Sequence, residues 1–442
     1  MIKIETHRLA LAVLIAVLVV NTTVLFCEAS SVTVSSDIDN HIEQLVTDGD
    51  IPSLHTCVVS GTNISWIRAY GEETSLDTVF LIGSVQKVFT AISILQLYEN
   101  ETIDIDDDVN DYLPFSLRHP DYPDSTITIR MLLAHRSGLT STLYSEFCYD
   151  WEGGYGSDFS QYVGDYPSVV GISLEDYLSI CLSTVGSLYN QGMWLFEPGT
   201  QYSYSNIGYK VLNYILESQT NLTVQEYMDD NIFTPLHMNN TGFNASEFTG
   251  HHATPYTRLL GNSSNTELPV WNGQYMIRST ARDMGHLVIA FMNDGQFDEY
   301  EMLAPETLQM MFEKISSDGL PKSLRQELMR EGYGLGMEVL NHGVFGHGGS
   351  TVGFTAEIRF NPETDIGYVR LSNVNAILSS SLENWNDIDR VTKAVRMSIL
   401  VHIEMIPPFD ALIIIVVASL VILTSSISYL IWKKKKRQST ES

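Results

Sequence analysis

The sequence predicts an α+β domain in which an antiparallel sheet is flanked by helices, with a helical subdomain in the middle of the chain. Strand-like runs cluster at the two ends of the main domain, at 53–60, 64–71, 334–340, 354–360 and 366–372. Segments with helical periodicity lie between them. A sheet made from both ends of the chain around a helical insertion fits this class.

Each element rests on its own pattern. Residues 37–48 carry apolar side chains on one side, which predicts an amphipathic helix. The turn at Gly61-Thr62-Asn63 joins the first two strands into a hairpin, and the segment 360–366 forms a second hairpin turn. The other predicted helices span 127–135, 173–183, 207–216, 224–232, 280–293, 305–312 and 382–404.

Two apolar runs stand apart at the ends of the chain. The first, at 9–20, follows basic residues and precedes small ones, which predicts a signal peptide over 1–29. The alternative is an uncleaved segment that adds a second span. The second run, at 411–432, exceeds the about 20 residues that cross a bilayer. Five basic residues follow it, so we expect a cytoplasmic tail over 433–442 and an extracellular domain over 30–406.

Composition and charge limit the classes of partner and cofactor that the protein can bind. The 442 residues carry a formal net charge of −28, from 53 acidic and 25 basic residues, and this field repels nucleic acid. The sequence contains no cluster of histidines and cysteines that would suggest a metal site, and we expect no cofactor. Cys57 lies in an apolar strand and reads as a buried free thiol, whereas Cys148 and Cys181 could form an extracellular disulfide. Sequons that permit glycosylation occur at Asn63, Asn100, Asn221, Asn239, Asn244 and Asn262.

The helix predicted over 82–97 is apolar on all sides, as buried helices are, yet it begins with Ser84 and Lys87. The spacing places both side chains on one face, one turn apart. A buried lysine is costly unless it is paired or used, and a serine beside such a lysine can be an activated nucleophile. The alternative is a serine that caps the helix and a lysine that extends to solvent.

Two further motifs follow in order. Tyr204-Ser205-Asn206 precedes a helix, and His347-Gly348-Gly349 precedes the strand at 354–360. Together with the flanking sequences VFLIGSVQKVFTAISILQL, MLLAHRSGL, FEPGTQYSYSNIGYKVL and FGHGGSTVGF, they resemble the serine β-lactamase-like family. The similarity is to its class C β-lactamase, DD-peptidase and esterase branch and covers about residues 37–404. It implies a β-lactamase/transpeptidase-like fold.

The resemblance implies a role for each motif residue. Ser84 would be the acylated nucleophile, and Lys87 with Tyr204 would act as its base. Asn206 would hold Lys87 and contact a substrate amide or carbonyl. The oxyanion hole would use the backbone N–H groups of Ser84 and Ser350, with Gly348 and Gly349 allowing close approach.

His347 departs from the pattern, because many relatives have lysine there. It would orient Tyr204 or bind a substrate carboxylate, the latter only weakly if neutral. We therefore expect a membrane-anchored serine hydrolase that cleaves a small ester, amide or peptide near the cell surface, with β-lactamase activity doubtful. The alternatives are a surface binding protein that keeps the fold without turnover, and a true DD-peptidase or β-lactamase.

Overall fold

The computed structural model describes residues 36–140, 172–244, 248, 251–257, 265–267, 276–315, 330–351 and 353–375. Within them the largest sheet has seven strands, in the order β2-β1-β13-β12-β11-β10-β9, and every neighbouring pair is antiparallel. The strands are β1 Ser53–Ser60, β2 Asn63–Gly71, β9 Arg330–Tyr333, β10 Glu338–Leu340, β11 Phe345–Thr351, β12 Phe354–Asn361 and β13 Ile366–Ser372.

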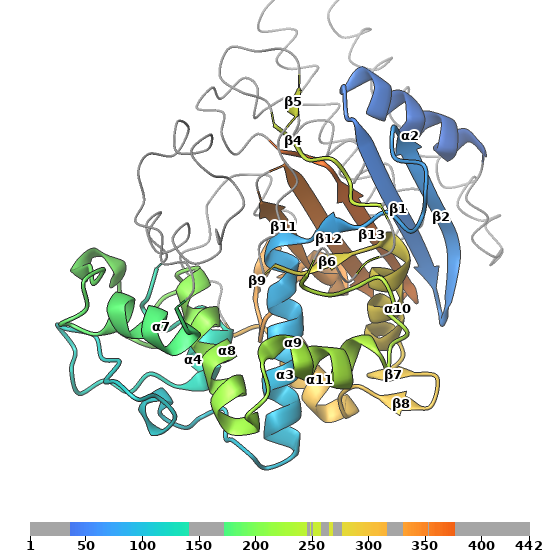
Figure 1. Cartoon of the computed structure of the whole chain (residues 1–442). Coiled ribbons are helices and arrows are strands. Elements are labelled where there is room, and N and C mark those ends of the chain that lie inside the picture. The colour runs from blue at the N-terminus through green and yellow to red at the C-terminus, as the bar shows by residue number, and fades with distance from the viewer. Residues whose placement is uncertain are drawn as a thin grey trace, which may run out of the picture.

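The two ends of the domain meet in the centre of this sheet. β1 pairs with β13 over its length, from Leu54 opposite Ser372 to Ser60 opposite Ile366. Figure 1 shows the early strands beside the late ones. The prediction that both chain ends build one sheet is therefore confirmed.

Helices cover both faces of the sheet. On β1, Cys57 faces α10 (Ala281–Met292), because a Cβ added at Gly285 would lie 2.9 Å from its sulfur. Tyr70 lies on the neighbouring strand β2, opposite Leu54, which is three positions from Cys57 and so faces the other side of the sheet. The Tyr70 hydroxyl donates to Asp39 of α2 (Ser36–Asp48) at 2.7 Å. Alternate residues of a strand point to opposite faces, so α2 and α10 lie on opposite sides.

The remaining elements form the helical region and its connections. The helices are α3 Gln86–Glu99, α4 Ile129–Leu133, α7 Leu174–Leu182, α8 Asn206–Thr220, α9 Val224–Met228 and α11 Pro305–Phe312. Short helical turns are η1 Gly83–Val85, η2 Val109–Asp111, η3 Gln191–Met193, η4 Asp229–Phe233 and η6 Asn341–Gly343. Two-residue strands are β3 Phe80–Leu81, β4 Tyr256–Thr257, β5 Thr266–Glu267, β6 Arg278–Ser279, β7 Gln296–Phe297, β8 Tyr300–Glu301 and β14 Val374–Asn375.

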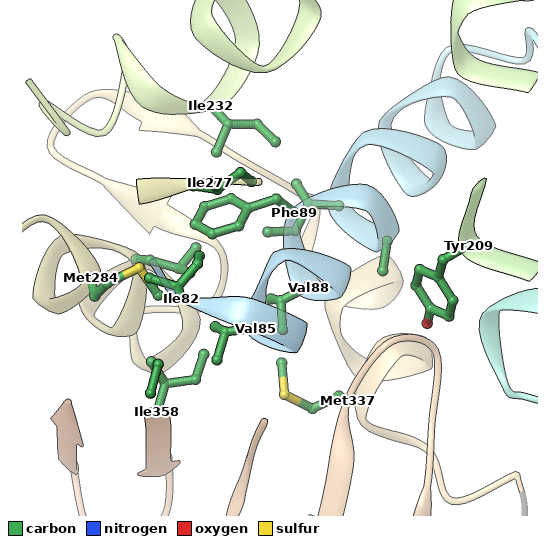
Figure 2. Packing of buried hydrophobic residues seen from close by; sticks show 14 of the residues in the cluster. Ile82, Val85, Val88, Phe89, Tyr209, Ile232, Ile277, Met284, Met337 and Ile358 are labelled. Atoms are coloured by element: carbon green, nitrogen blue, oxygen red, sulfur yellow. The ribbon is translucent and has the colours of Figure 1, made fainter. Parts of the chain in front are cut away.

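Helix α3 runs through the middle of the molecule, between the sheet and the helices α4, α7 and α8 (Figure 1). Every residue from Lys87 to Leu97 is buried. Figure 2 shows Val85 and Phe89 packed among side chains of other elements, including Met284 and Ile358. The prediction of a helix buried on all sides is confirmed, and its polar start is therefore held rigidly.

Two strand predictions at the late end of the chain were wrong in detail. The run predicted over 334–340 is a turn followed by β10, because Gly334 and Gly336 reverse the chain: the Gly334 N–H donates to the Met337 carbonyl at 2.8 Å, and Gly336 has φ +75°. The motif at His347 does not merely precede a strand but lies inside β11, which the glycines had concealed, since glycine is depleted in strands.

Several predictions fall outside the described residues: the signal peptide, the helix at 382–404, the transmembrane segment and tail, Cys148 and Asn262. Among the residues that are described, no helix is long and apolar enough to cross a membrane, and no cluster of His, Cys, Asp or Glu could hold a metal. Cys57 is a buried free thiol, as predicted, and burial raises its pKa to about 12.

Candidate active site

The start of the central helix lies directly against strand β11. Gly83, with φ +52°, turns the chain into the short η1 segment that carries Ser84. A Cβ at Gly83 would lie 2.8 Å from the Ser350 nitrogen, and one at Gly349 would lie 2.0 Å from the Ile82 carbonyl oxygen. The two glycines therefore bring the backbones of Ser84 and Ser350, the two predicted oxyanion donors, into neighbouring positions.

Lys87 lies between the predicted nucleophile and the predicted base. Its side chain is buried, and Nζ donates to Ser84 Oγ at 3.4 Å. The same ammonium lies 4.9 Å from the ring centre of Tyr204 and 5.6 Å from that of Tyr209, distances at which a cation is attracted to an aromatic face. The alternative of a lysine that extends to solvent is thereby excluded.

Two hydrogen bonds of Ser205 fix the position of the segment Tyr204-Ser205-Asn206. Ser205 caps α8 by accepting the Gly208 N–H at 3.1 Å, and Asn206 is the first residue of that helix. The Ser205 N–H in turn donates to Nδ1 of His135 at 3.1 Å. The predicted base is therefore held by a cap on one side and a buried histidine on the other.

His135 was not predicted as a site residue, although it belongs to the MLLAHRSGL segment that carries the family resemblance. It is buried, and its φ of +55° is unusual for a residue other than glycine. Four tyrosine rings surround it, with centroid distances of 5.8, 4.3, 5.0 and 4.8 Å to Tyr202, Tyr204, Tyr209 and Tyr333. Only the fold brings His135 and these rings together, since they come from three separate parts of the chain.

Two of these tyrosines are unsuited to act as bases. Burial raises the pKa of Tyr209 and of Tyr333 well above the ordinary value. Neighbouring phenols add to the shift of Tyr333, whereas the hydrogen bond with Tyr333 partly offsets that of Tyr209. The Tyr209 hydroxyl also donates to the Leu133 carbonyl at 2.7 Å. Both phenols therefore stay protonated near neutral pH. Tyr204, whose ring centre lies 4.9 Å from Lys87 Nζ, remains the predicted partner of Lys87.

His347 has other partners than predicted. Its side chain is 2% exposed, and its hydrogen bonds join Nε2 to the Tyr333 hydroxyl at 3.0 Å and Nδ1 to the Gly348 carbonyl at 2.6 Å. Neither reaches Tyr204. Burial lowers the pKa of His347 to about 4; the Glu338 charge opposes this shift, and the Lys87 charge adds to it. The neutral ring supplies no charge for a substrate carboxylate.

Asn375 on β14 is a second residue that sequence reasoning missed. Its amide donates to Ser350 Oγ at 2.5 Å and to the Thr351 carbonyl at 2.7 Å. It thereby anchors the end of β11 next to Ser84. An asparagine after a strand resembles an ordinary turn residue, so the sequence alone carries no signal for this role.

Comparison with models of protein families identifies the family of this chain. Residues 38–392, most of the chain, match the family model described as Beta-lactamase. The chain belongs to the beta-lactamase family. The predicted family is thereby confirmed, with the penicillin-binding-like serine hydrolase fold that its class C branch shares.

Proteins with curated descriptions that are similar to this chain include one from Staphylococcus aureus and one from Dictyostelium discoideum. Protein flp of Staphylococcus aureus (strain N315) is 26% identical over 353 residues, covering 77% of this chain and 63% of the relative. Beta-lactamase-like protein 2 of Dictyostelium discoideum is 27% identical over 299 residues, covering 63% of this chain and 49% of the relative. The chain therefore spans less than two thirds of the length of these relatives.

Solved structures share the fold at low identity. A penicillin-binding protein homologue from Pyrococcus abyssi gives a TM-score of 0.62 at 21% identity, covering 77% of this chain and 74% of that one. A D-stereospecific amidohydrolase from Streptomyces sp. gives 0.61 at 22%, covering 80% and 97%. The D-amino acid amidase from Ochrobactrum anthropi SV3 gives 0.62 at 18%, covering 82% and 99%. These similarities confirm the predicted α+β fold.

Proposed function

We propose that this protein hydrolyses an ester or amide through an acyl-enzyme on Ser84. The observation that carries the proposal is the buried ammonium of Lys87, within 3.4 Å of Ser84 Oγ and 4.9 Å from the centre of the Tyr204 ring. A cation between a hydroxyl and a phenol favours the deprotonated form of either group, and this is what activates a serine.

The reaction follows from this geometry. Ser84 Oγ attacks the substrate carbonyl carbon while its proton passes to the Lys87–Tyr204 pair, and the carbonyl oxygen becomes an oxyanion facing the N–H groups of Ser84 and Ser350. The oxyanion collapses, the bond to the leaving alcohol or amine breaks, and the same proton goes to the leaving group. Water then attacks the acyl-enzyme by the reverse sequence, which releases the acid and restores Ser84.

The neutral His347 favours substrates without a free carboxylate. Its buried imidazole stands where the family resemblance leads us to expect lysine in many members, and it offers no positive charge. The formal net charge of −28 adds a field that repels anions. Fold relatives described as a D-amino acid amidase and as EstCE1, a hydrolase with promiscuous acyltransferase activity, support an amide or ester as substrate.

A fluorophosphonate probe tests the nucleophile. Peptide mass spectrometry should find the adduct on Ser84, and Ser84→Ala should abolish it. Lys87→Met, which keeps the side-chain volume, should slow labelling by about 10²- to 10⁴-fold, the usual contribution of a general base. The matched control is Lys210→Met, since Lys210 is also buried but lies over the Tyr177 ring of α7.

The proposal fails if folded wild-type protein forms no adduct, or if Lys210→Met slows labelling as much as Lys87→Met. A panel of aryl esters, D-amino acid amides and penicillins then separates the substrates. Efficient penicillin hydrolysis or stable penicilloylation would favour the β-lactamase or DD-peptidase alternative. Ligand binding without turnover, unchanged in Ser84→Ala, would favour a non-catalytic binding protein.

We further infer that the hydrolase domain is extracellular and held at the membrane by residues 411–432. The apolar length of this segment and the basic residues at 433–437 support this orientation. In cells, the protein should resist alkaline carbonate extraction, and external protease should remove the domain while sparing a C-terminal tag. Release by carbonate, or protection of the domain in intact cells, would contradict the inference.

A further inference from the structure

Strand β11 loses one of its two neighbours just where the active site begins. β10 pairs with it only through Glu338 opposite Gly346 and Val339 opposite Phe345. On the other side β12 stays paired as far as Thr351 opposite Phe354. From His347 onward, the strand segment that carries Ser350 is therefore held by main-chain ladder bonds from one side alone.

A hydrogen bond from the side chain of Tyr333 contacts β11 on the side where pairing with β10 has ended. Tyr333 is the last residue of β9, two strands away, and its hydroxyl meets Nε2 of His347 at 3.0 Å. Tyr333 is itself fully buried, and its ring contacts that of His135 at 4.8 Å. Its main-chain carbonyl also accepts the Ile315 N–H at 3.0 Å. The hydroxyl is therefore presented from a rigid position.

The direction of this hydrogen bond follows from the partner of the other ring nitrogen. Nδ1 lies 2.6 Å from the Gly348 carbonyl oxygen, which can only accept, so Nδ1 carries a proton. The buried imidazole is neutral near pH 7, because its pKa is lowered to about 4. Nε2 therefore has a lone pair. The Tyr333 hydroxyl has two acceptors within reach, this nitrogen and the Tyr209 oxygen, and we assign its proton to Nε2, the more basic of the two.

We propose that Tyr333 is a positioning residue for the acylation of Ser84: its hydroxyl fixes the Nδ1–H tautomer of His347, and His347 in turn holds the Gly348 carbonyl and the strand carrying Ser350 beside the nucleophile. The inference rests on the proposed function. Tyr333 acts through His347 and does not touch the reacting atoms. Its loss should therefore affect the bound transition state more than substrate binding.

The variant Tyr333→Phe removes the hydroxyl and keeps the ring. With a chromogenic ester we expect kcat to fall about tenfold with KM within about twofold, as for the loss of one buried hydrogen bond in a positioned site. Long-range ¹H–¹⁵N spectra, with the His347 signals assigned by their absence in His347→Gln, should show an Nδ1–H imidazole in wild type. In Tyr333→Phe the same signals should shift to a tautomer mixture.

Tyr300→Phe is the matched control. Tyr300 is a partly buried tyrosine whose hydroxyl donates to the Asn231 main-chain carbonyl and accepts from Gln96, in a different part of the fold. It should leave both kcat and the His347 signals unchanged. The double variant Tyr333→Phe/His347→Gln should be no slower than His347→Gln alone, because the two residues act in series.

Three results would overturn the inference: an unchanged His347 tautomer in Tyr333→Phe, an equal fall in kcat in Tyr300→Phe, or additive losses in the double variant. Failure of the proposed function is separate. It shows as absent Ser84 labelling in wild type, whereas the spectra report the Tyr333–His347 bond without any turnover. If Tyr333→Phe proves unfolded, Tyr333→His, which keeps a ring donor, should preserve part of the signal and the rate.

Discussion

At the scale of single residues, the site is built by burial rather than by exposed charge. Lys87, His135 and His347 are each at most 4% exposed, yet each meets polar or aromatic partners. Burial disfavours the charged form of a histidine, so His347 is neutral, whereas the rings around Lys87 lower the cost of its charge. The same buried environment thus keeps Lys87 charged and His347 neutral.

The neutral His347 predicts a stability change with pH. Its folded pKa of about 4 lies below the unfolded value of 6.5, so the unfolded chain binds a proton first as pH falls. Stability should therefore be full above about pH 6.5 and decline by up to about 1.4 kcal/mol per pH unit towards pH 4. Urea unfolding between pH 7 and 4.5 should show a shallower decline in His347→Gln. His237→Gln, at a site 62% exposed, should run parallel to wild type; an equal flattening in both would contradict the assignment.

At the scale of elements, the contact between η1 and β11 depends on one glycine more than on its neighbour. A Cβ at Gly349 would meet the Ile82 carbonyl oxygen at 2.0 Å, whereas one at Gly348 would meet only an Arg359 side-chain nitrogen at 3.9 Å. Gly349→Ala should therefore cost about 1–3 kcal/mol, as overpacking does, and lower Tm by several degrees. Gly348→Ala should melt within about one or two degrees of wild type. Calorimetry showing equal melting of the two variants would refute this reading of the contact.

Sequence patterns predicted most elements because periodicity and turn chemistry are local. The helix at 305–312 and the strand at 366–372 have the predicted bounds, and Ser84, Lys87 and Tyr204 do come together. The pattern failed at β11, where glycines needed for close approach hide a strand. It also missed His135, Tyr333 and Asn375, because their roles arise from long-range contacts that no local spacing records.

At the scale of the whole molecule, the late strands supply the surface against which the early nucleophile is placed. β1 joins β13, β13 joins β12, and β12 joins β11, so the position of Ser350 depends on the sheet that the two chain ends build together. Helix α3 then fills the space between this sheet and the helical region (Figure 1). The site therefore forms only when the ends of the domain have met, which links catalysis to the completed fold.

The overall charge predicts how salt affects turnover. A formal net charge of −28 should raise the free energy of an approaching anion, and added salt screens this repulsion, since the Debye length falls from about 30 Å at 0.01 M to about 3 Å at 1 M. For a carboxylate-bearing aryl ester such as 4-nitrophenyl succinate, kcat/KM should rise severalfold between low and high sodium chloride. Its neutral counterpart 4-nitrophenyl acetate should change little. If instead salt lowered kcat/KM for the anionic ester alone, a local positive potential would dominate at the site, and the preference for substrates without a carboxylate would have to be abandoned.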